Sequence, residues 1–194
     1  MADLILKPGS DRTVVRRHPW IFAGSVDRLE GRARPGDTVL VMDSRGKPLA
    51  RAAWSPESQI RARVWSFDPE QSIDHAFIKR AVAASVARRA GHPWLAGQDG
   101  VRLIHGESDG LPGVIADRYG AVVVQLTSAG ADKWRDAIVA GLVQATGCTA
   151  VYERSDSDVR KLEGLGPVTG VVFGELPEAP LTIVENGVRM EVDV

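Results

Sequence analysis

Cationic and aromatic side chains stand together in one short run near the start of the sequence, Arg16-Arg17-His18-Pro19-Trp20-Ile21-Phe22. Arginine side chains hold phosphate groups and aromatic rings stack on bases, so this combination is typical of contact with RNA. The alternative is a buried strand from Trp20 to Phe22 that leaves only the arginines in solvent. We favour burial for Ile21 and for one of the two aromatic residues, whereas the two interpretations stay balanced for Arg16 and Arg17.

A second basic pair lies in the stretch with the clearest alternation, residues 60–67. Residues two apart in a strand point to the same side, so Arg61 and Arg63 share a face with Trp65. Two arginines on one face can bind an anion. Pairing with acidic residues across neighbouring strands is the alternative, and the residue pattern slightly favours it. The residues that we predict as RNA contacts are Arg16, Arg17, His18, Trp20, Arg61 and Arg63.

The densest polar segment of the chain is residues 105–113. Its His105, Glu107 and Asp109 are of the types that bind metals or transfer protons, yet such loops are common, and we favour a structural turn. Neither a Gly-x-Gly-x-x-Gly motif nor a Gly-Lys-Ser/Thr motif occurs. Cys148 has no basic neighbour that would favour a thiolate, so we interpret it as a small buried residue. We therefore predict no metal site and no catalytic residue in this chain.

Short strands separated by turns are expected to position the basic candidates. The clearest strands are residues 38–42, 49–54 and 60–67, a spacing that is typical of a small barrel or sandwich. The pattern changes at Ser72, a plausible N-cap for a helix over residues 73–90. We place the domain boundary in the segment that precedes this helix.

Strands and helices alternate in the rest of the chain, and an Asn-Gly pair at 186–187 indicates a type I′ turn between the last two strands. The sequence therefore predicts an α+β fold with two domains, residues 1–73 and residues 74–194, of which the second is a mixed α/β domain. Strands are expected over 101–104, 113–118, 121–126, 150–153, 181–185 and 188–194, and helices over 131–146 and 158–162.

Composition excludes several classes of protein. The 194 residues are 44% hydrophobic and carry a net charge of -1, which is typical of a globular chain. No apolar run approaches the roughly 18 residues that span a bilayer, and no secretory signal is present, so we expect no membrane partner. A single cysteine fits a reducing, cytoplasmic location.

The charge is unevenly distributed along the sequence. Residues 1–73 hold 12 Lys and Arg against 9 Asp and Glu, whereas residues 74–194 hold 12 against 16. Ten of the basic residues in the first part are arginines, which suit phosphate contacts. The first part is therefore the better candidate for binding nucleic acid.

Several stretches, taken in order, resemble one known family. Residues 17–22 and 55–65 are similar to the N-terminal PUA domain of RlmI-like class I 23S rRNA methyltransferases. These enzymes use S-adenosylmethionine to methylate carbon 5 of cytosine in large-subunit ribosomal RNA. Residues 102–113, with the run Gly-Glu-Ser-Asp-Gly-Leu-Pro-Gly, resemble the central domain of that family, as do residues 153–156 and 160–164.

The resemblance implies a PUA-like β pseudobarrel followed by an α/β central domain. Members of the family continue past the terminal hairpin into a Rossmann-like domain that binds S-adenosylmethionine and carries the catalytic cysteine. The expectation is therefore an RNA-binding, substrate-positioning part of such an enzyme, without its own S-adenosylmethionine site and inactive alone. The implied partners are large-subunit ribosomal RNA and the missing C-terminal methyltransferase domain.

Another class of function stays open beside this one. The acidic second part and the terminal hairpin also fit a protein-interaction or dimerisation module with no RNA role, because an open strand edge can pair with another chain. A homodimer is one form of this alternative. A hydrolase that uses His105, Glu107 and Asp109 is the weakest interpretation.

Overall fold

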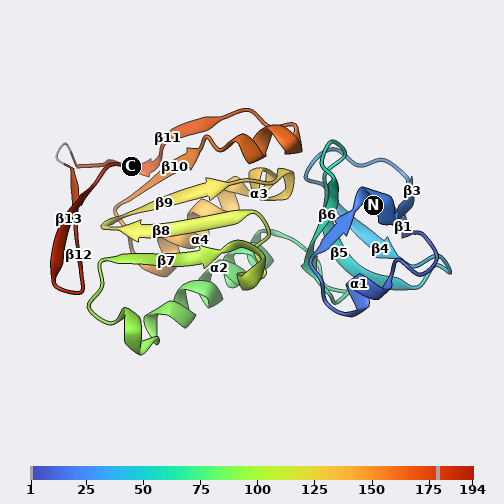
Figure 1. Ribbon diagram of the computed structural model, residues 1–194, viewed down its shortest axis with the longest axis horizontal. Coiled ribbons are helices and arrows are strands. Elements are labelled where there is room, and N and C mark those ends of the chain that lie inside the picture. The colour runs from blue at the N-terminus through green and yellow to red at the C-terminus, as the bar shows by residue number, and fades with distance from the viewer. Residues whose placement is uncertain (1, 178–179) are drawn as a thin grey trace.

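The computed structural model describes residues 2–177 and 180–194, which form two units placed end to end (Figure 1). The first unit is built on a six-stranded sheet with the order β2-β6-β5-β4-β1-β3. Its neighbouring strands are antiparallel, except for the parallel pair β1 and β4. The elements of this unit are β1 (Asp3–Leu6), α1 (Arg12–Val15), β2 (Trp20–Phe22), η1 (Ala23–Ser25), β3 (Val26–Glu30), β4 (Thr38–Met42), β5 (Pro48–Trp54) and β6 (Ile60–Ser66).

The core of the first unit follows from the alternation of its strands. Val39 and Val41 of β4 point inward while their neighbours along the strand stay partly exposed. The small residues Ala50 and Ala52 of β5 and Ala62 of β6 are fully buried in this core. Its members include Leu4, Leu6, Val14, Ile21, Val39, Val41, Ala50, Ala52, Ala62 and Val64.

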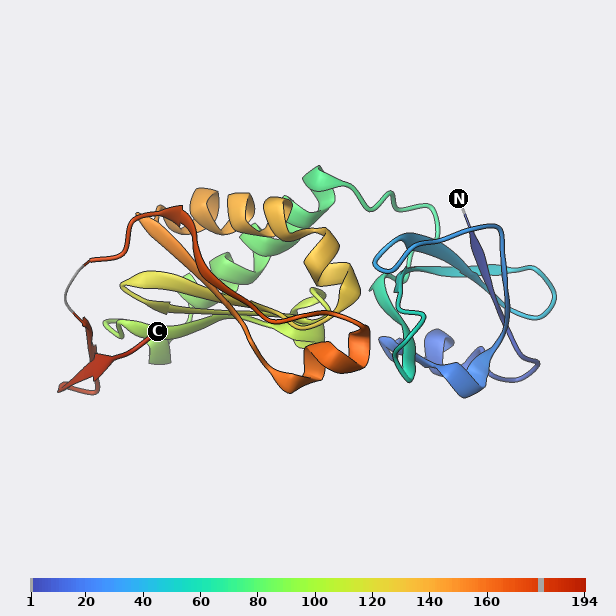
Figure 2. The ribbon, with the colours of Figure 1, turned by 90° about the horizontal axis from the view of Figure 1, so that it is seen from above.

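The second unit is a two-layer α/β structure on a five-stranded sheet with the order β11-β10-β9-β8-β7. Only β9 and β10 pair in parallel. Figure 2 shows α2 and α4 together on one face of this sheet. The strands are β7 (Gly100–His105), β8 (Val114–Tyr119), β9 (Ala121–Leu126), β10 (Ala150–Ser155) and β11 (Val168–Gly174). The helical segments are α2 (His75–Ala90), η2 (Pro93–Leu95), η3 (Gly106–Asp109), α3 (Ala129–Lys133), α4 (Arg135–Thr146) and η4 (Asp158–Glu163).

Two residues of the first unit belong to the core of the second. Ala53 of β5 and Trp65 of β6 are 2% and 5% exposed and pack with the apolar residues of the second unit. Gly130 of α3 lies against both of them. The outer side of the first sheet is therefore packed onto the second unit, and the two units share an apolar contact.

The last two strands form a hairpin, and the type I′ turn predicted at Asn186 and Gly187 is confirmed. β12 (Leu181–Glu185) and β13 (Val188–Val192) pair in antiparallel register. Asn186 and Gly187 between them have φ values of 48° and 81°, as a type I′ turn requires. The hairpin is attached to the second unit by Asp99, whose Oδ2 accepts from the Val184 amide at 3.0 Å.

Three elements differ from their sequence-based expectation. The first long helix begins at His75, because the Asp74 carboxylate caps it by accepting from the Phe77 amide at 2.7 Å, in place of Ser72. The helix expected over 131–146 is interrupted at Trp134, and Ser128 caps its first part. Strand β11 was not expected, since its Val-Thr-Gly-Val-Val-Phe-Gly sequence does not alternate.

None of the described helices is both long and apolar enough to cross a membrane.

Candidate functional site

The turn that follows α1 has an arginine, Arg17, at the position where glycine is usual. The amide of His18 donates to the Thr13 carbonyl at 2.9 Å, and the amide of Arg17 donates to the Val14 carbonyl at 2.8 Å. This pair of bonds is a Schellman motif, which ends a helix with one residue in the left-handed region, normally glycine. Here that residue is Arg17, with φ at 61°. The turn places the side chains of residues 16–18 outside the first unit, where all three are exposed.

Three rings cluster directly after this turn. The ring of Trp20 lies 5.9 Å from that of His18 and 6.2 Å from that of Phe22, both in edge-to-face geometry. Ile21 between them is 1% exposed, so its predicted burial is confirmed. Phe22 is 47% exposed and is therefore more open to solvent than Trp20, which is partly buried.

The predicted cations near this turn differ in their partners. Within residues 2–177 and 180–194, no hydrogen bond or ion pair engages the side chain of Arg16. The guanidinium of Arg17 lies 5.6 Å from the ring centre of Phe67, which follows β6. Both arginines thus keep their hydrogen-bond donors available for an anion.

Arg63 has a different environment. Its side chain is 9% exposed and donates to Glu163 at 3.0 Å and to Glu107 at 3.1 Å, both in the second unit. Its guanidinium also lies 5.8 Å from the ring centre of Trp20, and the indole N–H of Trp20 donates to Glu107 at 2.7 Å. Arg63 and Trp20 therefore contribute to the contact between the two units.

Arg61 is separated from Arg63 although both belong to β6. Its guanidinium lies 5.8 Å from the ring centre of Trp54 and donates to the carbonyl of Pro56. The side chain remains partly exposed. The two arginines therefore do not form one shared binding face. Arg63 contacts acidic side chains of the second unit, whereas Arg61 contacts residues of the first unit.

Glu163, at the end of η4, has no distinctive sequence pattern, yet it is a central group of this contact. Its side chain is 1% exposed and accepts from Ser55 at 2.8 Å and from the Ala129 amide at 3.2 Å, besides Arg63. Burial alone would raise its pKa, but the hydrogen bonds and the Arg63 charge hold the pKa below the usual value. Glu163 is therefore an ionised group at the interface.

The polar loop 105–113 has a structural role in this molecule. Asp109 accepts from Arg88 at 2.7 Å, from Arg89 at 2.6 Å and from the His105 amide at 2.6 Å. Burial alone would raise its pKa, yet these partners lower the pKa to about 2. Glu107 is engaged by Trp20 and Arg63. In the described part of the chain, no three His, Cys, Asp or Glu side chains are grouped as metal ligands.

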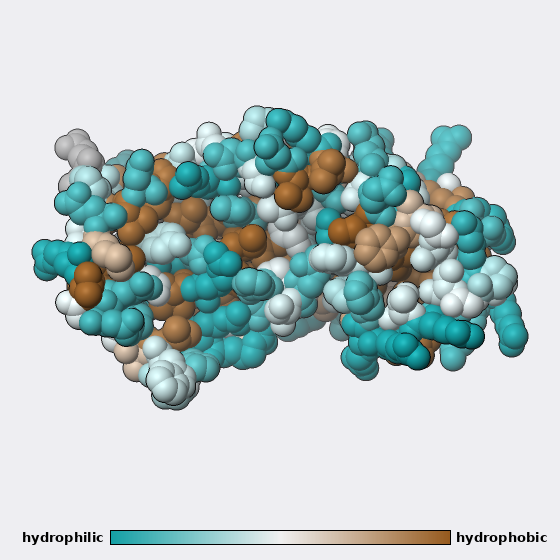
Figure 3. Space-filling model, viewed as in Figure 1, coloured by the Kyte–Doolittle hydropathy of each residue, from teal (hydrophilic) through white to brown (hydrophobic). Residues whose placement is uncertain are grey.

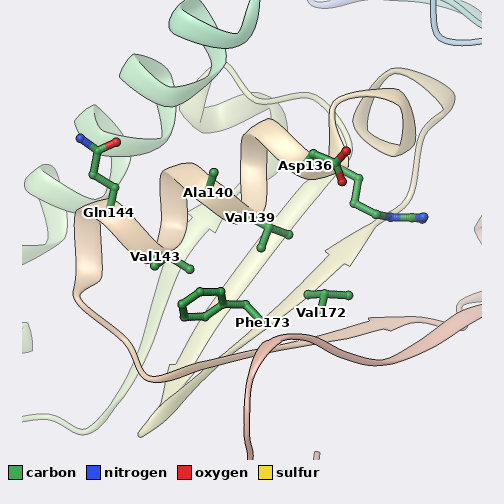
Figure 4. A pocket seen from close by; sticks show the side chains of 8 residues that line it. Asp136, Val139, Ala140, Val143, Gln144, Val172 and Phe173 are labelled. Carbon is green, nitrogen blue, oxygen red and sulfur yellow. The ribbon is translucent and has the colours of Figure 1, made fainter.

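A separate apolar groove lies on the second unit between α4 and the edge strand β11, with a volume of about 520 Å³. Figure 4 shows Val139 and Val143 of α4 opposite Val172 and Phe173 of β11. The pairing of β11 with β10 shifts between Val151 and Tyr152, so that Val172 is the extra residue of a bulge next to Phe173. Hydrophobic patches of this kind interrupt a mostly hydrophilic surface, as the view in Figure 3 shows for one face of the molecule.

Comparison with known proteins first identifies the class. Residues 4–67 match the PUA-like domain family, so the first unit is a PUA-like domain at the N-terminal side of an α+β chain. The chain is also homologous to proteins named ribosomal RNA large subunit methyltransferase I. It is 50% identical to the one from Salmonella arizonae over 98% of this chain and 48% of the relative, and 51% identical to one from Klebsiella pneumoniae over the same shares. The resemblance to RlmI-like methyltransferases is thereby confirmed.

The chain spans about half the length of the curated relatives that it matches. Solved structures have the same fold. A candidate SAM-dependent methyltransferase from Streptococcus mutans superposes with a TM-score of 0.77 at 18% identity, over 97% of this chain and 47% of the other. A candidate methyltransferase crystallised with SAH gives a TM-score of 0.78 at 18% identity, over the same shares.

Proposed function

We propose that this chain binds large-subunit ribosomal RNA through its PUA-like domain and positions it for a (cytosine-5) methyltransferase. The observation that carries the proposal is the exposed turn at residues 16–18. There Arg16 and Arg17 have no acidic partner among the described residues, and the ring of His18 lies 6.5 Å from the exposed ring of Phe22. Phosphate contacts of this kind fix the orientation of an RNA, whereas unpaired bases stack on aromatic rings. The names of the homologous proteins support ribosomal RNA as the partner.

The six predicted contact residues divide into two groups in this proposal. Arg16, Arg17, His18 and Arg61 face the RNA, because their side chains reach solvent. Trp20 and Arg63 act indirectly, since Glu107 and Glu163 hold them in the contact between the two units. Their role is to fix the angle at which the PUA-like domain presents RNA to the rest of the protein.

The methyl donor is assigned to a methyltransferase domain outside the described residues. Methylation at carbon 5 of cytosine requires an activated thiolate and a donor site. Cys148 is half-buried, and neither a cation nor a histidine contacts its thiol in the described part of the chain. The groove at α4 and β11 is lined mainly by aliphatic and aromatic side chains and has no glycine-rich turn. This groove does not fit a nucleoside-containing donor such as S-adenosylmethionine.

The proposal is tested by RNA affinity across a salt series, with a hairpin from large-subunit ribosomal RNA. Arg16→Ala is expected to weaken binding and to lower the slope of log affinity against log salt by about 0.7 to 0.9, the value for one phosphate contact. Arg28→Ala is the matched control, because Arg28 is an exposed arginine of the same domain that Asp27 and Glu30 already pair. Absence of binding by the unaltered chain at low salt would refute the proposal.

We infer self-association as a second candidate function, from the open groove at α4 and β11. An edge strand with exposed Val171, Val172 and Phe173 is a surface that another copy can cover. The mass of the protein in solution distinguishes a monomer from a dimer. Phe173→Asp is expected to convert a dimer to a monomer, and a monomeric unaltered chain at high concentration would exclude this candidate.

A further inference from the structure

A small pocket lies beside the Schellman turn, on the side of Arg17 that faces β5. Residues from three separate segments line it, with a volume of about 250 Å³. This is smaller than the roughly 300 to 1,000 Å³ of pockets for drug-sized ligands, so the size suits a single small group. The lining residues are Val14, Val15, Arg17, Lys47, Pro48, Leu49, Phe67 and Pro69.

The walls of the pocket combine apolar surface with two cations. Val15 is 64% exposed although it is aliphatic, and its side chain forms part of the rim. Arg17 and Lys47 stand at the same pocket. Among the residues that the structure describes, no carboxylate forms an ion pair with either side chain, although the charge of Asp43 interacts with that of Lys47. The carboxylate of Asp43 is occupied by the backbone amides of Arg45 and Lys47 in its own turn. The pocket is therefore lined by both polar and apolar groups, and two cations are among them.

Backbone geometry gives an independent reason to assign a ligand to this place. Glycine is the usual residue at the position of Arg17, because a side chain is strained at a φ of 61°. The Arg17 side chain is held over the ring of Phe67, at 5.6 Å from its centre, so the turn aims the guanidinium at the pocket. An arginine with a strained backbone conformation beside a pocket indicates a functional role for its side chain.

We propose that this pocket takes one unpaired nucleobase of the bound RNA, stacked on the Arg17 guanidinium, with the adjoining phosphate at Lys47. Bases stack on guanidinium planes and aromatic rings, and unpaired bases are the ones that a protein can reach in RNA. The inference rests on the proposed function and adds to it. It states that the PUA-like domain distinguishes RNA with an unpaired nucleotide from a fully paired stem.

Two hairpin RNAs that differ by one unpaired nucleotide test this inference. The unpaired base is 2-aminopurine, whose fluorescence reports stacking. The unaltered chain is expected to bind the hairpin with the unpaired base about tenfold more tightly, because that base stacks in the pocket. Arg17→Gly and Phe67→Leu are expected to remove this preference and the change in fluorescence. Arg45→Ala, which removes a charge from the same β4–β5 turn outside the pocket, is expected to keep both.

The outcomes separate this inference from the proposed function. Equal binding of both hairpins by the unaltered chain overturns the pocket and leaves RNA binding in place. Equal weakening of both hairpins by Arg17→Gly makes Arg17 a plain phosphate contact and also overturns the pocket. No binding of either hairpin at low salt refutes the proposed function and the inference with it.

Discussion

Arg63 of β6 and Glu163 at the end of η4 form an ion pair of 3.0 Å across the contact between the two units, with side chains that are 9% and 1% exposed. A buried pair is costly to desolvate and becomes favourable only when further hydrogen bonds complete it. Ser55 supplies one such bond to Glu163, and Glu107 supplies a second acceptor for Arg63. The pair links the two units, and we expect it to favour one relative orientation of them.

Replacing Glu163 with glutamine is expected to destabilise the protein by about 3 kcal/mol, because Arg63 loses the buried one of its two counter-charges. Urea denaturation at pH 7 measures this change. Small-angle scattering of the folded variant is expected to show a wider range of inter-unit orientations. The pKa of Glu163 is lowered in the folded state, so its contribution is present at neutral pH and is lost on acidification.

Lys161→Gln is the control for this substitution. It removes an ion pair with Asp158 in the same segment, where the side chains are 74% and 89% exposed. Exposed pairs of this kind contribute between zero and about 1 kcal/mol. A Glu163→Gln variant no less stable than Lys161→Gln would show that the buried pair does not hold the units together.

The apolar part of the same contact depends on Gly130. A Cβ at this position would lie 2.4 Å from the Cβ of Ala53 and 3.3 Å from Cζ2 of Trp65. We expect Gly130→Ala to destabilise the protein by about 1 to 3 kcal/mol through overpacking, despite the better helix propensity of alanine. Gly141→Ala in α4 is the control, because it gives the same gain in helix propensity. Its Cβ would lie 3.2 Å from the Cβ of Val82, a less severe approach. Thermal unfolding compares the two variants, and equal midpoints would contradict the close approach at Gly130.

Local patterns predicted the elements of this fold well where each element carries its own signal. The alternation in β4, the Asn186-Gly187 turn and the long helix that ends at Ala90 were all accessible from residue order, because each depends on neighbours in the sequence. Only the start of that helix was misplaced, at residue 73 in place of His75. The edge strand β11 was missed. Its pairing with β10 contains a bulge and its side chains stay exposed, so neither periodicity nor burial marks it in the sequence.

The candidate site shows the same limit. Periodicity placed Arg61 and Arg63 on one strand face, but residues about 44 and 100 positions further along the chain decided where Arg63 points. Phe67 and Lys47 of the pocket carry no motif, and only the folded chain brings them to Arg17. Sequence reasoning therefore found the basic turn, whereas the partners of its side chains came from tertiary contacts.

Arg17→Gly is expected to leave the free energy of unfolding within about 1 kcal/mol of the unaltered chain. Glycine relieves the left-handed backbone at φ 61° but gives the unfolded chain more freedom, and the two effects nearly cancel. Urea denaturation measures this, and Arg17→Val is the contrasting variant, because a β-branched residue at positive φ is strongly disfavoured. A large loss of stability in Arg17→Gly would mean that the guanidinium supports the fold through Phe67 and is not held there for a ligand.

Asp109 is expected to make stability depend on pH between about pH 4 and pH 2. Its pKa is lowered from 3.8 to about 2 in the folded protein by Arg89 and Arg88, against the effect of burial. Because the pKa of Asp109 is lowered in the folded state, its ionised carboxylate contributes fully to stability above pH 4. This contribution is lost as the pH falls toward 2. Asp109→Asn should therefore lower the free energy of unfolding by about 2 kcal/mol at pH 7. The difference in stability from the unaltered chain should shrink between about pH 4 and pH 2. Asp158→Asn, at a carboxylate that is 89% exposed, is the control variant. A constant stability difference for Asp109→Asn down to pH 2 would place the effect of Asp109 outside its ion pairs.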